Sequence, residues 1–106
     1  MSGKIELLSL TKSDKAGKKM MAKFKVNGRE RTVHFGSAPN KDYTIYYATE
    51  GKEKADKMKA AYLARHSKTG ENWKNPLSAG ALSRWVLWSE PTVSAGIKQY
   101  KRVFGF

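Results

Sequence analysis

The sequence predicts an α+β fold in which a small antiparallel sheet of about three strands packs against about three helices. Residues 19–35 form two runs of alternating apolar and polar side chains around Asn27-Gly28, a dipeptide that suits the tight turn of a β-hairpin. From residue 50 onward, apolar residues recur at helical spacing instead. With 106 residues, the chain has room for one small core. We therefore expect a single domain, 1–106, with a sheet part at 1–36 and a helical part at 50–104.

The turn at Asn27-Gly28 fixes the predicted register of the hairpin, because a two-residue loop determines which residues of the two strands lie opposite each other. The pairs expected on one face are Val26 with Arg29, Phe24 with Arg31, Ala22 with Val33 and Met20 with Phe35. The pairs expected on the other face are Lys25 with Glu30 and Lys23 with Thr32. The first face should therefore be apolar in the part away from the turn. The second face should be solvent-exposed and mostly basic.

Two further segments have extended character. Residues 4–10 are predicted to add a third strand, since two strands alone are only marginally stable in water. The aromatic segment 43–47 fits either a fourth short strand or an extended connection, and the sequence leaves both options open.

The first predicted helix covers residues 52–66. Ala55, Met58 and Tyr62 recur there at helical spacing, while charged side chains occupy most of the remaining circumference. Lys52 and Asp56 are spaced to pair across one helical turn. Such a helix should bury only a narrow stripe.

The other two helices are predicted at 76–88 and 91–104. The earlier one should begin at Asn75-Pro76, because Asn is a good N-cap and Pro is tolerated in the first helical position. The later one should end at Gly105 and carries a buried stripe of Val93, Ile97, Tyr100 and Phe104. The residues expected to share one core are Phe24, Val33, Phe35, Trp85, Trp88 and Ile97.

The net charge of +12, from 21 Lys and Arg against 9 Asp and Glu, indicates an acidic partner. A surface of that charge attracts phosphate backbones, anionic membranes and acidic protein surfaces alike. The alternative is that the charge serves only solubility.

Several classes of function are disfavoured by composition. The chain has no Cys, which excludes disulfides and thiolate metal sites and fits a reducing compartment. His34 and His66 lie in different predicted elements, so no metal site is expected. No stretch approaches the roughly 20 apolar residues of a membrane span. Without a catalytic constellation or a phosphate-binding glycine loop, we expect neither an enzyme nor a cofactor.

Basic residues interleaved with aromatic ones are the candidate binding residues. Phosphate contacts and base stacking use this mixture of side chains. The candidates are Lys23, Lys25, Arg29 and Arg31 on the hairpin, and Lys57, Arg65, Lys68, Trp73 and Lys74 around the helices. The alternative is an ordinary solvated charged face, with Trp85 and Trp88 in the core and Trp73 in either role.

Sequence-specific recognition of DNA is disfavoured. Residues 76–88 and 91–104 have the layout of a helix-turn-helix, but the second of them offers few polar side chains to contact bases. These are Lys98, Gln99, Lys101 and Arg102.

Residues 34–44 and 65–104 also carry a pattern of short motifs. The motifs are Arg65-His66, Glu71-Asn72-Trp73, Pro76, Ala79-Gly80, Ser83-Arg84-Trp85, Leu87-Trp88, Pro91-Thr92 and the stretch 97–104. In them the chain resembles a family of small, basic, uncharacterised proteins encoded by giant and algal large DNA viruses. The resemblance implies no activity or catalytic residue. It implies a setting: the cytoplasm or nucleus of an infected eukaryotic cell, with packaging in the virion as an option.

Two roles fit this setting. In the first, the protein binds the backbone of DNA or RNA, or another polyanion, without strong sequence specificity. In the second, it is a minor capsid or other virion protein whose charge docks it on an acidic viral structural protein. Modulation of a host protein is a third role that no feature of the sequence favours.

Overall fold

The computed structural model describes residues 4–38, 40–68 and 73–106. The strands β1 (Ile5–Lys12), β2 (Lys18–Val26) and β3 (Arg29–Ser37) form an antiparallel sheet in the order β1-β2-β3. The helices are α1 (Tyr43–Glu50), α2 (Lys52–Lys68), α3 (Ala79–Leu82), its π-helical continuation η1 (Ser83–Leu87), and α4 (Val93–Phe104). The predicted α+β class is confirmed. The residues Glu71-Asn72 of the motif described above lie outside the described residues.

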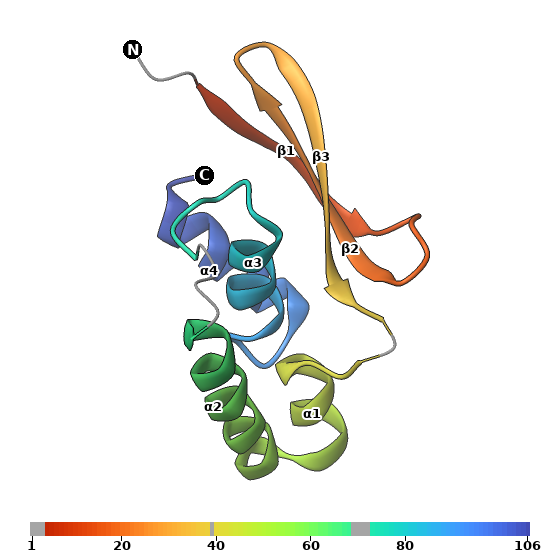
Figure 1. Ribbon diagram of the computed structural model, residues 1–106, viewed down its shortest axis with the longest axis vertical. Coiled ribbons are helices and arrows are strands. Elements are labelled where there is room, and N and C mark those ends of the chain that lie inside the picture. Colours follow the sequence, from red (N-terminus) through yellow and green to blue (C-terminus); the bar gives the residue numbers. More distant parts are fainter. Residues whose placement is uncertain (1–3, 39, 69–72) are drawn as a thin grey trace.

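The helices lie beside and below one half of the sheet, and the other half projects away from them (Figure 1). α3 and α4 lie next to the sheet, whereas α1 and α2 continue the molecule beyond the end of β3 (Figure 1). The turn between β2 and β3 is at the opposite, projecting end (Figure 1). The molecule is therefore elongated, measuring 44 × 28 × 23 Å along its principal axes.

The predicted hairpin register is confirmed on both faces. Every predicted pair between residues 20 and 35 is present, from Met20 with Phe35 to Val26 with Arg29. Asn27 and Gly28 have φ angles of 52° and 81°, the positive values that a type I′ turn requires. The third strand is also present, with an irregularity between Leu7 and Ser9 that leaves Leu8 47% exposed.

Both options that the sequence left open for residues 43–47 are wrong, because the segment is the first part of α1. Asp42 caps this helix, since its carboxylate accepts the backbone N–H of Ile45 at 3.2 Å. Tyr43 and Thr44 are buried, and Tyr43 donates a hydrogen bond to Asp56 of α2 at 2.7 Å. The cap and the packing on α2 outweigh the preference of aromatic residues for strands.

The helix predicted at 76–88 begins later, at Ala79, with Ser78 as its N-cap. The Ser78 hydroxyl accepts the backbone N–H of Ala81 at 3.0 Å. Asn75 instead closes a turn, because its side-chain oxygen accepts the N–H of Leu77 at 3.0 Å. Beyond Leu82 the helix widens into η1, which the sequence analysis missed.

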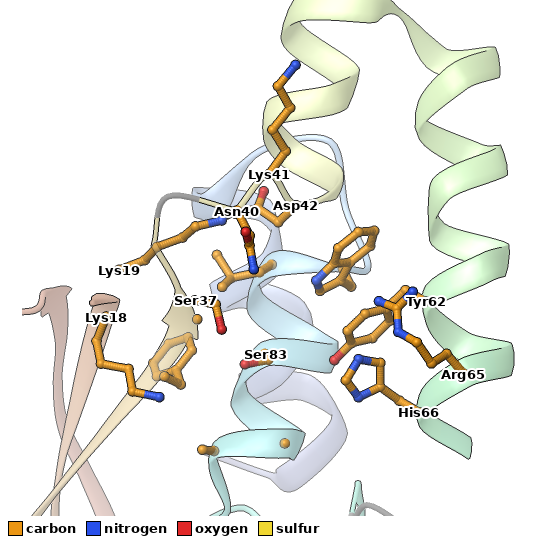
Figure 2. Close-up of a pocket in the computed structure, with 16 residues that line it drawn as sticks. Lys18, Lys19, Ser37, Asn40, Lys41, Asp42, Tyr62, Arg65, His66 and Ser83 are labelled. Atoms are coloured by element: carbon orange, nitrogen blue, oxygen red, sulfur yellow. Dashed lines mark hydrogen bonds and ion pairs between the residues drawn. The ribbon is translucent and has the colours of Figure 1, made fainter. Parts of the chain in front are cut away.

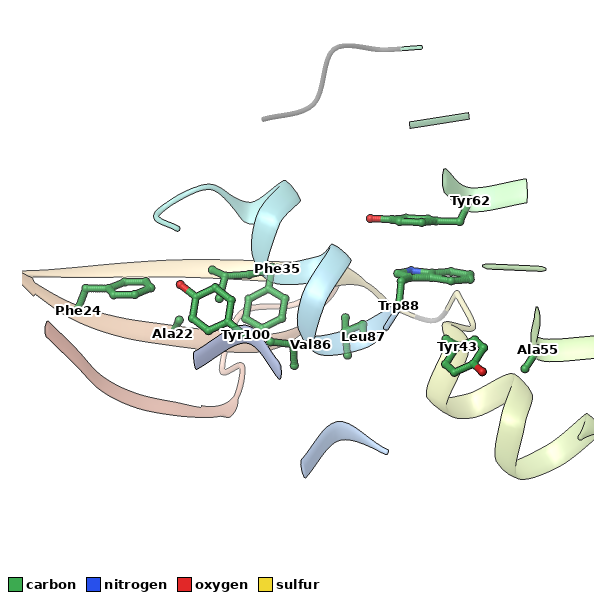
Figure 3. Close-up of a cluster of buried hydrophobic side chains, with 11 residues drawn as sticks. Ala22, Phe24, Phe35, Tyr43, Ala55, Tyr62, Val86, Leu87, Trp88 and Tyr100 are labelled. Carbon is green, nitrogen blue, oxygen red and sulfur yellow. The ribbon is translucent and has the colours of Figure 1, made fainter. Parts of the chain in front are cut away.

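One hydrophobic cluster joins the sheet to the helices (Figure 3). Of the predicted core, Phe24 and Phe35 are fully buried and Trp88 is buried, while Val33, Trp85 and Ile97 are partly buried and pack against the cluster. Tyr100 of α4 is also fully buried and donates a hydrogen bond to the carbonyl of Pro76 at 2.7 Å. The stripe predicted for α4 thus faces the core.

Candidate functional site

The hairpin cations, Lys23, Lys25, Arg29 and Arg31, are all exposed, but they do not share one face. Lys23 and Lys25 lie on the face opposite to buried Phe24, whereas Arg31 pairs with Phe24 and Arg29 with Val26. All of them lie in the half of the hairpin near its turn, the end that projects from the helices (Figure 1). A single flat surface therefore cannot contact all of them at once.

The two faces also differ in local charge. Lys25 has a carboxylate residue opposite it on each side, Glu6 on β1 and Glu30 on β3. Arg29 and Arg31 lie opposite apolar residues, so no acid faces them across the sheet. The arginine face is the more positive of the two.

Lys57 stands apart from the other candidates. It lines a shallow hollow at the end of α1 and the start of α2 together with Glu50, Glu53 and Lys54, so acidic and basic side chains are mixed around it. The pair predicted one turn earlier is present, with Lys52 and Asp56 2.6 Å apart. This part of α2 is a mixed-charge surface.

Trp73 is half-buried and contributes to internal packing. Its ring stacks at 6.5 Å on that of Tyr62, and the guanidinium of Arg84 lies 5.7 Å from its centroid. Tyr62 in turn stacks on Trp88, with ring centroids 4.3 Å apart and planes 7° apart. Trp73 and Trp88 therefore both stack on Tyr62 within the protein. Lys68 and Lys74 flank this region and are exposed.

A cleft of about 270 Å³ lies where the end of the sheet, the start of α1, the last turns of α2 and the α3–η1 helix meet (Figure 2). Among the described residues, its charged lining consists of Lys18, Lys19, Lys41, Arg65 and Asp42, with His66 beside them. Arg65 is the one predicted site residue that the structure places there. Lys68, Trp73 and Lys74 are not part of its described lining, and the hairpin cations are at the other end of β2.

Both carboxylate oxygens of Asp42, the acidic residue of the described cleft lining, are bound to other groups of the protein. Asp42 is 2% exposed and forms an ion pair with Lys19 at 2.8 Å. Its other oxygen accepts hydrogen bonds from the hydroxyl of Thr44 and the N–H of Ile45. Because these partners occupy both oxygens, Asp42 serves to hold β2 against the start of α1.

The remaining positive charge of the cleft is only partly compensated. Lys41 forms an exposed ion pair with Glu50 at 3.1 Å. Lys18 and Arg65 form no ion pair with any described residue. Ser37, Asn40 and Ser83 add neutral polar side chains that make no hydrogen bond within the described ranges. The cleft thus combines uncompensated cations with available hydrogen-bond donors.

The π-helical turn η1 shapes one wall of the cleft. The N–H of Trp88 bonds to the carbonyl of Ser83 at 3.1 Å, five residues back, which widens the helix at this point. Ser83, Leu87 and Trp88 all line the cleft from this turn. Lys18, Lys41 and Ser83 were not predicted as site residues. For Lys41, the polar stretch 37–42 between strand and helix was a usable signal.

In the described ranges, no three His, Asp or Glu residues are grouped to hold a metal ion. No helix there has the length and apolar character to cross a membrane. No protein-family model matches the chain, and no curated protein or solved structure matches it either. The resemblance to viral proteins therefore stays a prediction, and function has to be inferred from the residues themselves.

Proposed function

We propose that this protein binds nucleic acid, or another polyanion, through its exposed cations and without strong sequence specificity, acting as a binding protein and not as an enzyme. One observation carries the proposal. The chain has 21 basic residues against 9 acidic ones, and only three ion pairs form among the residues that the structure describes. Most of the Lys and Arg residues that the structure describes therefore form no ion pair with another described residue.

Contacts with phosphates explain how such a surface binds. Each Lys or Arg that neutralises a phosphate releases a condensed counterion, which favours binding and makes it weaken as salt rises. Phosphate contacts carry no information about base sequence. Trp73 and Trp88 each stack on Tyr62, which reduces the ring surface that they offer to bases. These features support binding to the backbone.

The arginine face of the hairpin is the best-supported contact surface for a long polyanion. Arg29 and Arg31 lie near the projecting turn and face no acid across the sheet. Lys23 extends the positive surface to the other face, where it lies opposite Ser9 and Thr32. A projecting ribbon with cations on both faces can approach phosphates on both sides of a groove.

The test is the salt dependence of binding to random-sequence duplex DNA and single-stranded RNA. Replacing all the hairpin cations by Ala should lower the slope of log affinity against log salt by about 1 to 3 units, since each lost phosphate contact removes about 0.9. A matched control replaces exposed cations of the helices, Lys54, Lys98, Lys101 and Arg102, and should change the slope less. An equal change in both variants would reject the hairpin surface. Absence of binding at physiological salt would reject the function.

A virion role is the second candidate, in the viral setting that the resemblance suggests. Arg29 and Arg31 lie beside the apolar residues Val26 and Phe24, and arginine next to apolar surface is typical of protein interfaces. In this role the arginine face docks on an acidic shell protein. Stoichiometric retention of the chain in shells freed of nucleic acid is the expected result, and loss of the chain with the nucleic acid would contradict it.

A further inference from the structure

We propose that the cleft between the end of the sheet, α1, α2 and η1 binds a phosphomonoester group, as found at the end of a nucleic-acid strand or on a free nucleotide. This is one discrete, concave site, separate from the hairpin cations at the other end of β2. It does not rest on the polyanion binding proposed above, because a small phosphorylated molecule alone would occupy it.

The charges in the cleft match a doubly charged phosphate. Lys18 and Arg65 come from opposite walls, the start of β2 and the last turns of α2 (Figure 2). Neither has an ion-pair partner among the described residues, so together they offer two uncompensated positive charges. Lys41 is a third cation whose ion pair with Glu50 is solvent-exposed, and exposed pairs of this kind are weak enough to rearrange.

The neutral polar groups fit the same ligand. Ser37 at the end of β3, Asn40 after it and Ser83 of η1 project towards the space between Lys18 and Arg65 (Figure 2). Hydroxyl and amide groups donate hydrogen bonds to phosphate oxygens, and guanidinium groups bind them with two parallel bonds. The carboxylate of Asp42 is held by Lys19, Thr44 and Ile45. An anion that enters the cleft therefore meets hydrogen-bond donors, and the nearby carboxylate is already bound to other groups.

The size and walls of the cleft limit what enters. Its volume of about 270 Å³ is near the lower end for small-molecule sites, which span roughly 300–1,000 Å³. That space suits one terminal nucleotide and excludes a duplex. Tyr62 and Trp88 line the cleft but are only 5% and 9% exposed, and their faces are stacked on each other. Recognition should therefore depend on the phosphate and not on the base.

The cleft is held in shape without a ligand. Asp42 ties Lys19 of β2 to the start of α1, which positions the connection that carries Ser37 and Asn40. The bond from Trp88 to Ser83 fixes the wall formed by η1. A site formed in advance loses little conformational entropy when it binds, so a few charged contacts give measurable affinity.

The test compares ligands that differ only in the phosphate. A short labelled oligonucleotide with a 5′-phosphate should bind about tenfold more tightly than the same strand with a 5′-hydroxyl, as expected for one set of charge-assisted hydrogen bonds. AMP and adenosine form the second pair. Competition by AMP but not by adenosine identifies free nucleotides as occupants, whereas phosphate-dependent binding of the strand alone identifies strand ends. Equal binding within both pairs overturns the proposal.

A matched pair of variants links the effect to the cleft. Arg65→Ala should abolish the tenfold preference for the phosphorylated ligands, while Arg102→Ala, which removes the same charge from an exposed site on α4, should keep it. Arg65 is exposed and forms no hydrogen bond or ion pair with another described residue, and circular dichroism checks that the variant is folded. Equal loss in both variants would overturn the site. Binding of random duplex DNA is measured in parallel, so a failure of general polyanion binding is seen separately.

Discussion

Two of the cations that contribute to the net charge have structural roles inside the molecule. The guanidinium of Arg84 lies 4.2 Å from the centre of the Trp85 ring and donates a hydrogen bond to the carbonyl of Trp88 at 3.2 Å. The ammonium of Lys59 bonds to the carbonyl of Ser89 at 3.0 Å. Burial lowers the pKa of both groups, and for Lys59 the positive charge of Arg84 lowers the pKa further. They hold η1 and the segment after it in place.

Replacing Arg84 should therefore lower the free energy of unfolding more than replacing an exposed cation does. Arg84→Ala removes its cation–π contacts with Trp73 and Trp85 and a hydrogen bond to a carbonyl, which together cost about 1–3 kcal/mol of unfolding free energy. Urea unfolding measures the change. Lys101→Ala, at an exposed position of α4, is the control and should stay within about 0.5 kcal/mol of the parent chain. An Arg84→Ala variant as stable as this control would contradict the assigned role.

Tyr43 gives the stability a specific dependence on alkaline pH. Burial, followed by the hydrogen bond to Asp56, raises the pKa of Tyr43 to about 12. The unfolded chain has a tyrosine pKa of about 10, so the folded state holds this proton more tightly. The stabilisation is complete below pH 10 and is lost as the pH rises to about 12.

Tyr43→Phe should accordingly flatten the fall of unfolding free energy between about pH 10 and 12. Burial also raises the pKa of Tyr100, so the difference between the parent chain and the variant isolates the contribution of Tyr43. Tyr46→Phe is the control, because its hydroxyl forms no hydrogen bond with the described residues. Identical pH profiles for the parent chain and Tyr43→Phe would contradict the prediction.

At the level of elements, local chemistry determined which features the sequence revealed. The Asn27-Gly28 turn alone is enough to specify the register of the hairpin, and with it the two faces on which Lys23 and Arg31 lie. The helical nature of 43–47 depends instead on Asp42 being buried and on contact with α2. The N-cap Asp42 is a local signal that was not used to predict this helix, whereas the packing of Tyr43 on α2 leaves no pattern within residues 43–47.

The cleft illustrates the same limit. Arg65 was predicted as a binding residue from its basic neighbourhood, but Lys18 and Lys41 belong to segments that only the tertiary fold brings to Arg65. No sign of η1 is present in the sequence either, because π-helical turns are rare and no residue spacing marks them. Charge and composition therefore indicate a class of ligand, which stays a prediction, and they do not locate the cleft.

Helix α4 approaches η1 closely at Gly96. A Cβ atom built on Gly96 would lie 2.1 Å from the carbonyl oxygen of Val86, far inside contact distance. Gly96→Ala should therefore push the two helices apart and cost about 1–3 kcal/mol, despite the better helix propensity of Ala. Thermal unfolding measures the loss.

Ser94→Ala is the matched control, since Ser94 is exposed on the same helix and its replacement should leave the melting temperature nearly unchanged. If Gly96→Ala were as stable as Ser94→Ala, the close approach of α4 to η1 would be wrong. Loss of phosphomonoester binding in a folded Gly96→Ala variant would further link the position of η1 to the shape of the cleft.

For the whole molecule, the important property is how the charge is distributed. The ion pairs of the described residues lie at the start of α1, between α1 and the segment before it, and on α2, so the hairpin turn has none of them. The two proposed binding regions lie at opposite ends of the sheet. One is a projecting ribbon that suits an extended backbone, and the other a concave site that suits a single terminal group.

β2 connects these two regions directly, since Lys18 lines the cleft and Lys25 lies near the hairpin turn. As the central strand it is hydrogen-bonded on both sides, so it can neither shorten nor slide. Seven residue steps of about 3.4 Å make it a rigid spacer of about 24 Å. Under the two proposals, a nucleic-acid strand binds the cleft with its terminal phosphate and the hairpin cations with its backbone. The distance set by β2 then equals about seven nucleotide rises, so β2 would determine the shortest strand that reaches both regions.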